Sequence, residues 1–526
     1  MVFLLKESVK INIMFNGNSN LKEKYIMANN LKLGLQLEVI RKVNPCLMSY
    51  NVEMTEVTGG TFWKAYTPGQ VAGTEAFPPI KSMADMGGIM QVYPPIDLYN
   101  QKLRDLAKEF GPVWVRVSGT WATKTYYDFD GTTKGVAPQG YQSVLTKQQW
   151  LGVLDFCKAI NAKLLISVNN CEGLHKANEP WNPSQAELLF KTAKEYGVPV
   201  EAAEFMNEPN MLAFSGAPVG YTGKDYVRDQ DLFMKWVKEN YPECLLVGPC
   251  TVAMEASHED GFELNAGGIV GMMGNNCTTD ELMDGATQKF DVYSYHYYNG
   301  ISDRLASVVP SMHWDPERTL SEAYLKVASL SAKASCPSRD KYVPNGEMWV
   351  TESGDAGGGG NSWASTFMDV FRTLNELGTF VTITDGIIFH NTLASSAYGF
   401  LEHGTFDPRP NYFAVLLWTR LMGNTVYETN EPIREGAHVF AHSRKDGKDG
   451  IAYLVINNSK TESTTVELPR EAEVYVLSAE HLRSETMLLN GRPLVLGENN
   501  ELPDLSGERK QGTLELAPAT CTFIVL

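Results

Sequence analysis

The chain has 526 residues, of which 43% are hydrophobic and 10% aromatic, a composition typical of a folded globular protein. Its 62 acidic residues outnumber the 45 basic ones and give a net charge of -17, which argues against a broad surface for nucleic acid. No window approaches the roughly 18 apolar residues of a membrane-spanning helix, so no membrane partner is expected.

The amino-terminal residues 1–29 are polar and irregular, and we interpret them as a disordered extension. The apolar run after Met1 is too short for a signal peptide, which predicts a cytoplasmic protein. The eight cysteines form no CxxC pair and have no metal-ligand spacing, so neither a metal nor a cofactor is expected. Residues 30–44 then alternate between apolar and polar positions, which predicts a strand.

Residues 45–424 alternate between short apolar runs and amphipathic segments, as the (β/α)8 barrel does. A doubly wound open sheet would give a similar alternation. The predicted strands are 46–54, 114–120, 163–169, 202–208, 245–250, 291–298, 348–354 and 386–392, and representative predicted helices are 98–110, 147–160, 183–196, 229–240, 320–335, 365–377 and 411–422.

From residue 425 to residue 526 the pattern changes to short alternating runs that are separated by turns rich in Gly, Asn, Asp and Pro. This pattern is typical of an antiparallel β-sandwich. We expect the strand over 30–44 to join it. The predicted fold is therefore α/β, with a barrel over 45–424 followed by a sandwich domain.

Two glutamates end apolar runs inside the predicted barrel, Glu208 in Met206-Asn207-Glu208-Pro209 and Glu352 in Val350-Thr351-Glu352-Ser353. The carboxyl ends of barrel strands carry the chemistry of this architecture. Glycoside hydrolysis needs one carboxyl group to protonate the leaving oxygen and a second one that faces the anomeric carbon. The pair therefore predicts a glycosidase, and it favours the barrel over the open sheet.

These motifs resemble glycoside hydrolase family 79, the β-glucuronidases and heparanase of clan A, whose members retain anomeric configuration. The resemblance covers most of residues 44–526 and is most specific over 181–210. It continues through His296-Tyr297-Tyr298-Asn299-Gly300, the glycine run 357–360, in which Gly357 stands where the family has an aromatic, and the closing segment 521–525.

The resemblance implies a role for each matching residue. Glu208 is expected to be the acid/base and Glu352 the nucleophile, with Tyr297 donating a hydrogen bond to the nucleophile. The substrate carboxylate is expected at the amides of Gly358 and Gly359 and the hydroxyl of Tyr398. The other substrate-binding residues expected are Asn207, which matches the residue that bonds the 2-hydroxyl, together with His296, Glu53, Asn169 and Thr120.

The predicted function is a retaining exo-β-glucuronidase that acts on a glucuronide-containing glycan or glycoconjugate. An endo-acting heparanase- or hyaluronidase-like enzyme is the main alternative, although it would require a basic cleft, and Arg304 is the only base close after the His-Tyr-Tyr motif. A clan member acting on arabinose or xylose, or an inactive carbohydrate-binding protein, remain further alternatives. The long segment 59–95 is predicted to form a wall that closes the site into a pocket.

Overall fold

The computed structural model describes residues 30–81, 83–252 and 277–526. The extension expected over 1–29 lies outside the described residues. In the described part of the chain, no helix combines the length and the apolar composition that crossing a membrane requires.

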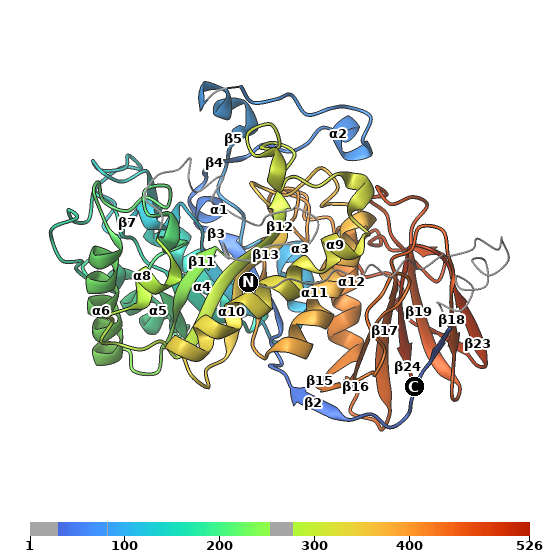
Figure 1. Ribbon diagram of the computed structural model, residues 1–526. Coiled ribbons are helices and arrows are strands. Elements are labelled where there is room, and N and C mark those ends of the chain that lie inside the picture. The colour runs from blue at the N-terminus through green and yellow to red at the C-terminus, as the bar shows by residue number, and fades with distance from the viewer. Residues whose placement is uncertain (1–29, 82, 253–276) are drawn as a thin grey trace, which may run out of the picture.

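Eight parallel strands close into a barrel, so the barrel prediction is confirmed and the open sheet is excluded (Figure 1). The strand order around the barrel is β10-β11-β12-β13-β14-β3-β6-β9. Each predicted run overlaps one of these strands. Their bounds are β3 Met48–Glu53, β6 Trp114–Ser118, β9 Lys163–Ser167, β10 Ala202–Glu204, β11 Leu245–Val252, β12 Val292–Ile301, β13 Met348–Gly357 and β14 Ile388–His390.

Helices alternate with these strands and pack outside them. The helix α4 begins after Thr146, whose side chain caps the amide of Gln149, and it ends at Asn161 in the left-handed conformation. The helix expected over 320–335 is instead divided at Lys326. The helices are α1 Met54–Thr58, α2 Pro68–Ala72, α3 Gln101–Lys108, α4 Lys147–Ile160, α5 Ala186–Tyr196, α6 Gly223–Asn240, α8 Thr279–Met283, α9 Glu322–Leu325, α10 Val327–Tyr342, α11 Val370–Ile383 and α12 Pro410–Leu421.

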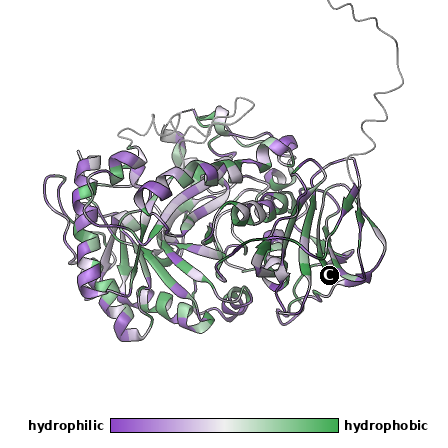
Figure 2. Ribbon diagram, turned by 60° about the horizontal axis from the view of Figure 1, so that its bottom comes forward, coloured by the Kyte–Doolittle hydropathy of each residue, from purple (hydrophilic) through white to green (hydrophobic). Residues whose placement is uncertain are grey.

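The barrel strands alternate between outward side chains that meet the helices and inward ones that fill the barrel. The outward set belongs to one large apolar cluster, which includes Val115 and Val117 of β6. The inward set begins with an apolar cluster that includes Trp114, Ala202 and Trp349. Apolar residues accordingly follow the strands in Figure 2. The inward residues that come next are polar, and they form the site described below.

The carboxyl-terminal strands build the second part of the molecule, to the right of the barrel in Figure 1. A nine-stranded sheet, with β22 paired to β19, faces a three-stranded sheet of order β1-β18-β23. The strands are β15 Met422–Tyr427, β16 His438–Arg444, β17 Ile451–Asn457, β18 Thr464–Glu467, β19 Ala472–Ser478, β20 Leu488–Leu489, β21 Arg492–Pro493, β22 Glu508–Lys510, β23 Thr513–Leu516 and β24 Thr520–Val525.

The segment 30–44 contributes two strands to this part of the molecule, where the sequence predicted one. Asn30–Lys32 is β1 and pairs with β18, whereas Val39–Lys42 is β2 and pairs with β15 in the other sheet. The β1–β18 pair is parallel, unlike the antiparallel pairing expected of a sandwich. The chain therefore crosses from one sheet to the other before it enters the barrel.

The segment 59–95 rises above the barrel beside the ends of β12 and β13 (Figure 1). It contains an antiparallel pair, β4 Gly60–Trp63 and β5 Met90–Tyr93, as well as the helix α2. The 3-10 turn η1 Met83–Ile89 also lies in this segment. Shorter elements elsewhere in the described chain are β7 Thr125–Asp128, β8 Ser143–Thr146, and the 3-10 turns η2 Ala122–Lys124, η3 Pro209–Met211, η4 Pro310–Met312, η5 Pro316–Arg318 and η6 Phe367–Asp369.

The barrel and the sandwich meet along helix α11 in a close contact. The imidazole of His438 on β16 contacts the amide oxygen of Asn375 through Nδ1 at 2.7 Å. One turn further along α11, Gly378 lies against the ring of Phe440, and a Cβ added there would be 2.4 Å from that ring. The lack of a side chain at this position therefore allows the helix to approach the sheet.

We predict that Gly378→Ala destabilises the protein by about 1–3 kcal/mol, because an overpacked methyl group costs more than the gain in helix propensity. Chemical denaturation measures this change in the free energy of unfolding. Gly152→Ala is the matched control, because its added Cβ meets Tyr99 at 3.5 Å, an ordinary contact. Equal stability changes for the two variants would contradict the close-approach explanation.

Candidate active site

The two predicted glutamates meet inside the barrel. Glu208 follows β10 and has a left-handed backbone, with φ 46°. Glu352 lies within β13, and each residue is 7% exposed. Side-chain ligand atoms of Glu208, His296 and Glu352 all lie within 4.8 Å of one another. The two carboxyl groups therefore face a common space.

An irregularity in β13 turns Glu352 into the barrel. Trp349 packs inside the barrel and Val350 packs outside it, so strict alternation would place Glu352 outside as well. The pairing registers with both neighbouring strands shift between Val350 and Ser353, which leaves an extra residue on β13. This bulge lets Glu352 pair with His296 and point inward.

The guanidinium of Arg116 connects most of the site. It donates to Glu204 at 2.9 Å, to the amide oxygen of Asn207 at 2.8 Å, and to Glu352 at 3.3 Å. Arg116 and Glu204 are completely buried. Burial opposes the charge of Arg116, yet the carboxylates of Glu204 and Glu352 raise its pKa. A permanent positive charge therefore lies beside Glu352.

His296 lies between the two glutamates, and its surroundings determine its tautomer. Burial lowers its pKa to about 4, so the ring is neutral near pH 7. Its Nε2 lies 3.3 Å from the guanidinium of Arg116, which can only donate. Nδ1 therefore carries the proton and donates toward Glu208 at 3.1 Å. This contact places His296 beside Glu208.

The tyrosine that contacts Glu352 is Tyr298, and the prediction of Tyr297 for this contact is wrong. The Tyr298 hydroxyl donates to Glu352 Oε1 at 2.5 Å. Tyr297 belongs to the outer apolar cluster and donates to Asn299. Successive side chains of a strand point to opposite faces, so His296 and Tyr298 face inward while Tyr297 faces the helices.

The side chain of Asn391, after β14, connects Glu352 to Tyr398. Its amide nitrogen lies 3.2 Å from Glu352 Oε1, 3.0 Å from the Tyr298 hydroxyl and 3.1 Å from the Tyr398 hydroxyl. The rings of Tyr298 and Tyr398 stack. Gly354 lies beside both rings, because a Cβ added to it would be 3.2 Å from the Tyr298 ring and 3.4 Å from the Tyr398 ring. The predicted residue Tyr398 thus reaches the site.

The two predicted asparagines, Asn207 and Asn169, lie in different places relative to the glutamates. Asn207 lies at the centre of the site, and its buried Nδ2 has no hydrogen-bond partner among the described residues. A buried unpaired donor beside the two glutamates is suited to a substrate hydroxyl. Asn169 donates instead to the carbonyl of Thr125 at 3.0 Å, outside this hydrogen-bonded group. Thr120, after β6, is half-buried and likewise makes no described hydrogen bond to the group.

Glu53 ends β3 and borders the site. Burial raises its pKa well above the ordinary value, and the nearby Glu352 and Glu56 raise it further. Its Oε2 is buried and has no described partner. A Cβ at Gly119, where φ is +91°, would lie 1.5 Å from that oxygen. The glycine is therefore required for Glu53 to occupy its place.

Gly358 and Gly359 form the turn directly after β13. Their carbonyl oxygens accept from the guanidinium of Arg304 at 3.2 Å and 3.1 Å. Trp63 of the segment 59–95 packs on Gly359, where a Cβ would meet its side chain at 2.6 Å. The turn is therefore held between two loops at the mouth of the barrel.

Burial raises the pKa of Glu208 to about 7, and the nearby charge of Arg116 opposes this rise. Glu352 is not among the causes of this shift. A carboxyl group with this pKa holds a proton in much of the population near neutral pH. Glu208 can therefore donate a proton.

The cluster of Glu208, His296 and Glu352 has ligand atoms that a divalent metal ion could bind. Arg116 contacts both Glu352 and His296, however, so its positive charge opposes a cation there. The arrangement is better suited to proton transfer and to stabilising a carboxylate.

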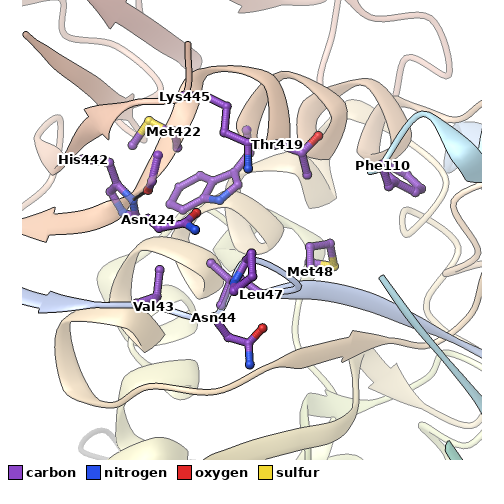
Figure 3. A pocket seen from close by; sticks show the side chains of 13 residues that line it. Val43, Asn44, Leu47, Met48, Phe110, Thr419, Met422, Asn424, His442 and Lys445 are labelled. Atoms are coloured by element: carbon purple, nitrogen blue, oxygen red, sulfur yellow. Dashed lines mark hydrogen bonds between the residues drawn. The ribbon is translucent and has the colours of Figure 1, made fainter. Parts of the chain in front are cut away.

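A pocket elsewhere in the molecule takes no part in this chemistry (Figure 3). It lies at the start of β3, the opposite end of the barrel, between that strand and the sandwich. Val43, Trp418, His442 and Lys445 are among the residues that line it. Its free volume of about 30 Å³ has room for little more than a water molecule.

The chain is similar over most of its length to several heparanase-like and glucuronidase proteins. Heparanase-like protein 1 of Arabidopsis thaliana is 25% identical, over 82% of this chain and 85% of the relative. Hyaluronoglucuronidase of Hirudo nipponia is 23% identical, over 82% and 90%. Baicalin-beta-D-glucuronidase of Scutellaria baicalensis is 24% identical, over 82% and 84%. No family model matches the chain.

Among solved structures, the fold is similar to that of a 4-O-alpha-L-rhamnosyl-beta-D-glucuronidase from Fusarium oxysporum 12S. The TM-score is 0.59 at 12% sequence identity, over 94% of this chain and all of the other. The relatives confirm the resemblance to the heparanase-like and glucuronidase group of glycoside hydrolases, and the chain is a glycoside hydrolase.

Sequence reasoning missed Arg116, Glu204, Tyr298 and Asn391 as parts of the site. Arg116 carried a usable signal, because a charged residue between two valines of a buried strand points into the barrel. Tyr298 could have been preferred over Tyr297 from its even spacing with His296. Asn391 gave no comparable local signal.

We predict that Tyr298→Phe lowers kcat of glycoside hydrolysis about 10- to 100-fold, the effect of losing a hydrogen bond to a charged group. Steady-state kinetics measures the change. Tyr297→Phe is the matched control, since it removes a hydroxyl that contacts Asn299 on the outer face of the same strand. If Tyr297→Phe reduced kcat as much as Tyr298→Phe, the assignment of the contact would be wrong.

Proposed function

We propose that the protein is a retaining exo-β-glucuronidase that removes terminal β-D-glucuronic acid from a glycan or glycoconjugate. The observation that carries the proposal is the pair Glu208 and Glu352, with carboxyl oxygens within 4.8 Å of each other inside the barrel. Retaining glycosidases hold their carboxyl groups about 5–5.5 Å apart, whereas inverting enzymes separate them by roughly 6.5–9.5 Å to admit a water.

In this mechanism Glu352 attacks the anomeric carbon and forms a covalent glycosyl-enzyme. Arg116, Tyr298 and Asn391 hold its two oxygens by donating hydrogen bonds. These donors hold the carboxylate in a fixed orientation before it attacks. The charge that develops on the sugar ring is stabilised by the same carboxylate.

Glu208 donates its proton to the leaving oxygen and later takes one from the attacking water. Its Oε1 accepts from His296, so the proton to be transferred is carried on the other oxygen. Asn207, with its unpaired Nδ2, is placed to bond a hydroxyl of the sugar. Glu53 would bond a second hydroxyl.

Recognition of glucuronic acid is assigned to the amides of Gly358 and Gly359 and to Tyr398. The Tyr398 hydroxyl accepts from Asn391 at 3.1 Å and so keeps its own proton free to donate. Baicalin-beta-D-glucuronidase and hyaluronoglucuronidase, by their names, both act on glucuronides. The substrate is therefore a glucuronide in this proposal.

Exo action is supported by the segment 59–95. The Tyr66 hydroxyl donates to the carbonyl of Gly360 at 2.8 Å, and Trp63 packs on Gly359. Through these contacts the segment borders the barrel mouth on the side of the glycine turn. The alternative is an endo-β-glucuronidase, which the similarity to heparanase-like protein 1 and hyaluronoglucuronidase favours.

The deciding experiment compares p-nitrophenyl β-D-glucuronide with a glucuronate-containing glycosaminoglycan and sizes the products. We expect release of nitrophenol and, from the polymer, single glucuronate residues. Oligosaccharide products of intermediate size would support the endo alternative. No cleavage of either substrate would contradict the proposed function.

We predict that kcat/KM decreases above about pH 7, because Glu208, with a pKa of about 7, then loses the proton that it must donate. Glu208→Gln should remove this alkaline limb, and it should slow alkyl glucuronides far more than nitrophenyl glucuronide, whose leaving group needs no proton. A pH series of both substrates measures these effects.

Glu56→Gln is the control for this limb, because burial raises the pKa of Glu56 to about 7 as well. The limb should persist in that variant. A limb that disappeared in Glu56→Gln but remained in Glu208→Gln would overturn the assignment of the acid.

A further inference from the structure

Arg304 is a buried cation with an unusual set of partners. It lies in the loop after β12 and is 1% exposed. Nη2 donates to the carbonyl of Lys64 at 2.6 Å, and Nη1 donates to the carbonyls of Gly358, Gly359 and Gly360 at 3.2, 3.1 and 2.8 Å. Its guanidinium also lies 3.8 Å from the centre of the Tyr66 ring.

Every polar contact of Arg304 in the described chain is to a backbone carbonyl, and none is to a carboxylate. The neighbouring Asp303 is engaged elsewhere, with His313 at 2.7 Å and the amide of Ser362 at 2.7 Å. A buried charge without a counter-ion is costly, and natural proteins rarely keep one without a reason. An anion supplied from outside the chain would balance this charge.

The direction of the peptide groups shows where that anion would bind. In a trans peptide the carbonyl of one residue and the amide of the next point to opposite sides. The carbonyl of Gly357 accepts from the amide of Ser302, and that of Gly358 accepts from Arg304. The amides of Gly358 and Gly359 therefore point away from the loop of Arg304.

These two amides have no hydrogen-bond partner among the described residues, whereas the amide of Gly360 donates to Ala356 at 3.1 Å. The Tyr398 side chain is within electrostatic reach: burial raises its pKa, and Arg304 opposes the rise. Two free amides and a buried positive charge behind the peptide groups thus lie at one turn, and the same charge acts on the Tyr398 side chain.

We propose that Arg304 is a positioning residue for substrate selection. It orients the free amide of Gly359, whose peptide group it holds at the carbonyl of Gly358, and it supplies the positive charge that offsets the substrate carboxylate from behind the turn. It acts through the peptide groups and does not touch the sugar. The inference rests on the proposed function, because it assumes an anionic group on the sugar.

This arrangement explains how an anionic sugar can bind beside Glu53, Glu208 and Glu352. The hydrogen bond from Arg304 to the carbonyl of Gly358 polarises that peptide group and strengthens the amide of Gly359 as a donor. Because the guanidinium is fixed by Lys64 and by Tyr66, it cannot swing forward to pair with Glu352. A flexible lysine at the surface of the site would lack that restraint.

The test compares p-nitrophenyl β-D-glucuronide with p-nitrophenyl β-D-xyloside, which lacks the C5 carboxylate. Arg304→Met should lower kcat/KM for the glucuronide about 10- to 100-fold and that for the xyloside less than about threefold. Arg304→Lys, which keeps the charge, should restore part of the difference. If the wild type hydrolyses only glucuronides, the inhibition constants of glucuronate and of glucose as competitive inhibitors give the corresponding comparison between an anionic and a neutral sugar.

Tyr66→Phe is the matched control, because it removes a hydrogen bond to the same turn without changing the charge. It should shift the ratio between the two substrates by less than about threefold. Equal losses for both substrates in Arg304→Met would show a merely structural role and overturn the inference. If Arg304→Met does not fold, Arg304→Lys replaces it in the test. The inference is then overturned if the ratio of kcat/KM for the glucuronide to that for the xyloside is the same in Arg304→Lys, in Tyr66→Phe and in the wild type.

Failure of the proposed function is distinguishable from failure of this inference. A wild type that hydrolyses the xyloside faster than the glucuronide would contradict the glucuronidase itself. A wild type that prefers the glucuronide, combined with Arg304 variants that keep this preference, would contradict only the role of Arg304.

Discussion

The site depends on one buried guanidinium, that of Arg116, which lies among carboxylates inside the barrel. It contacts Glu204 and Glu352 and orders Asn207 and His296 through the same planar group. Removing one member of such a buried group leaves uncompensated charge, at a cost of about 3–5 kcal/mol. The strands β3, β6, β10, β12 and β13 must therefore keep their register for the glutamates to keep their places.

The two buried arginines near the site differ in what they contact. Arg116 pairs with carboxylates directly, so its charge acts on Glu352. Within the described chain Arg304 donates its hydrogen bonds to carbonyls, so its charge reaches the barrel mouth through peptide groups. A chain with a net charge of -17 can in this way hold positive potential at two buried positions.

Much of the fold could be predicted from periodicity. Each predicted apolar run overlaps one barrel strand, although β11, β12 and β13 extend two or three residues further, and helix α4 matches the range 147–160. Glu208 and Glu352 were also predictable, since each ends or interrupts an apolar run beside a turn residue. The division of residues 30–44 into β1 and β2 was not, because pairing with two different sheets is a long-range choice.

The sequence by itself determined most of the strand and helix segments and the position of two glutamates beside the ends of apolar runs, because periodicity and local turn chemistry are short-range properties. Only the tertiary structure decided which side chains meet inside the barrel. The bulge in β13 turns Glu352 inward against simple alternation, and closure of the barrel brings Arg116 and Asn391 to it. Those contacts join strands that are far apart in the chain, and a local sequence pattern does not predict such long-range contacts.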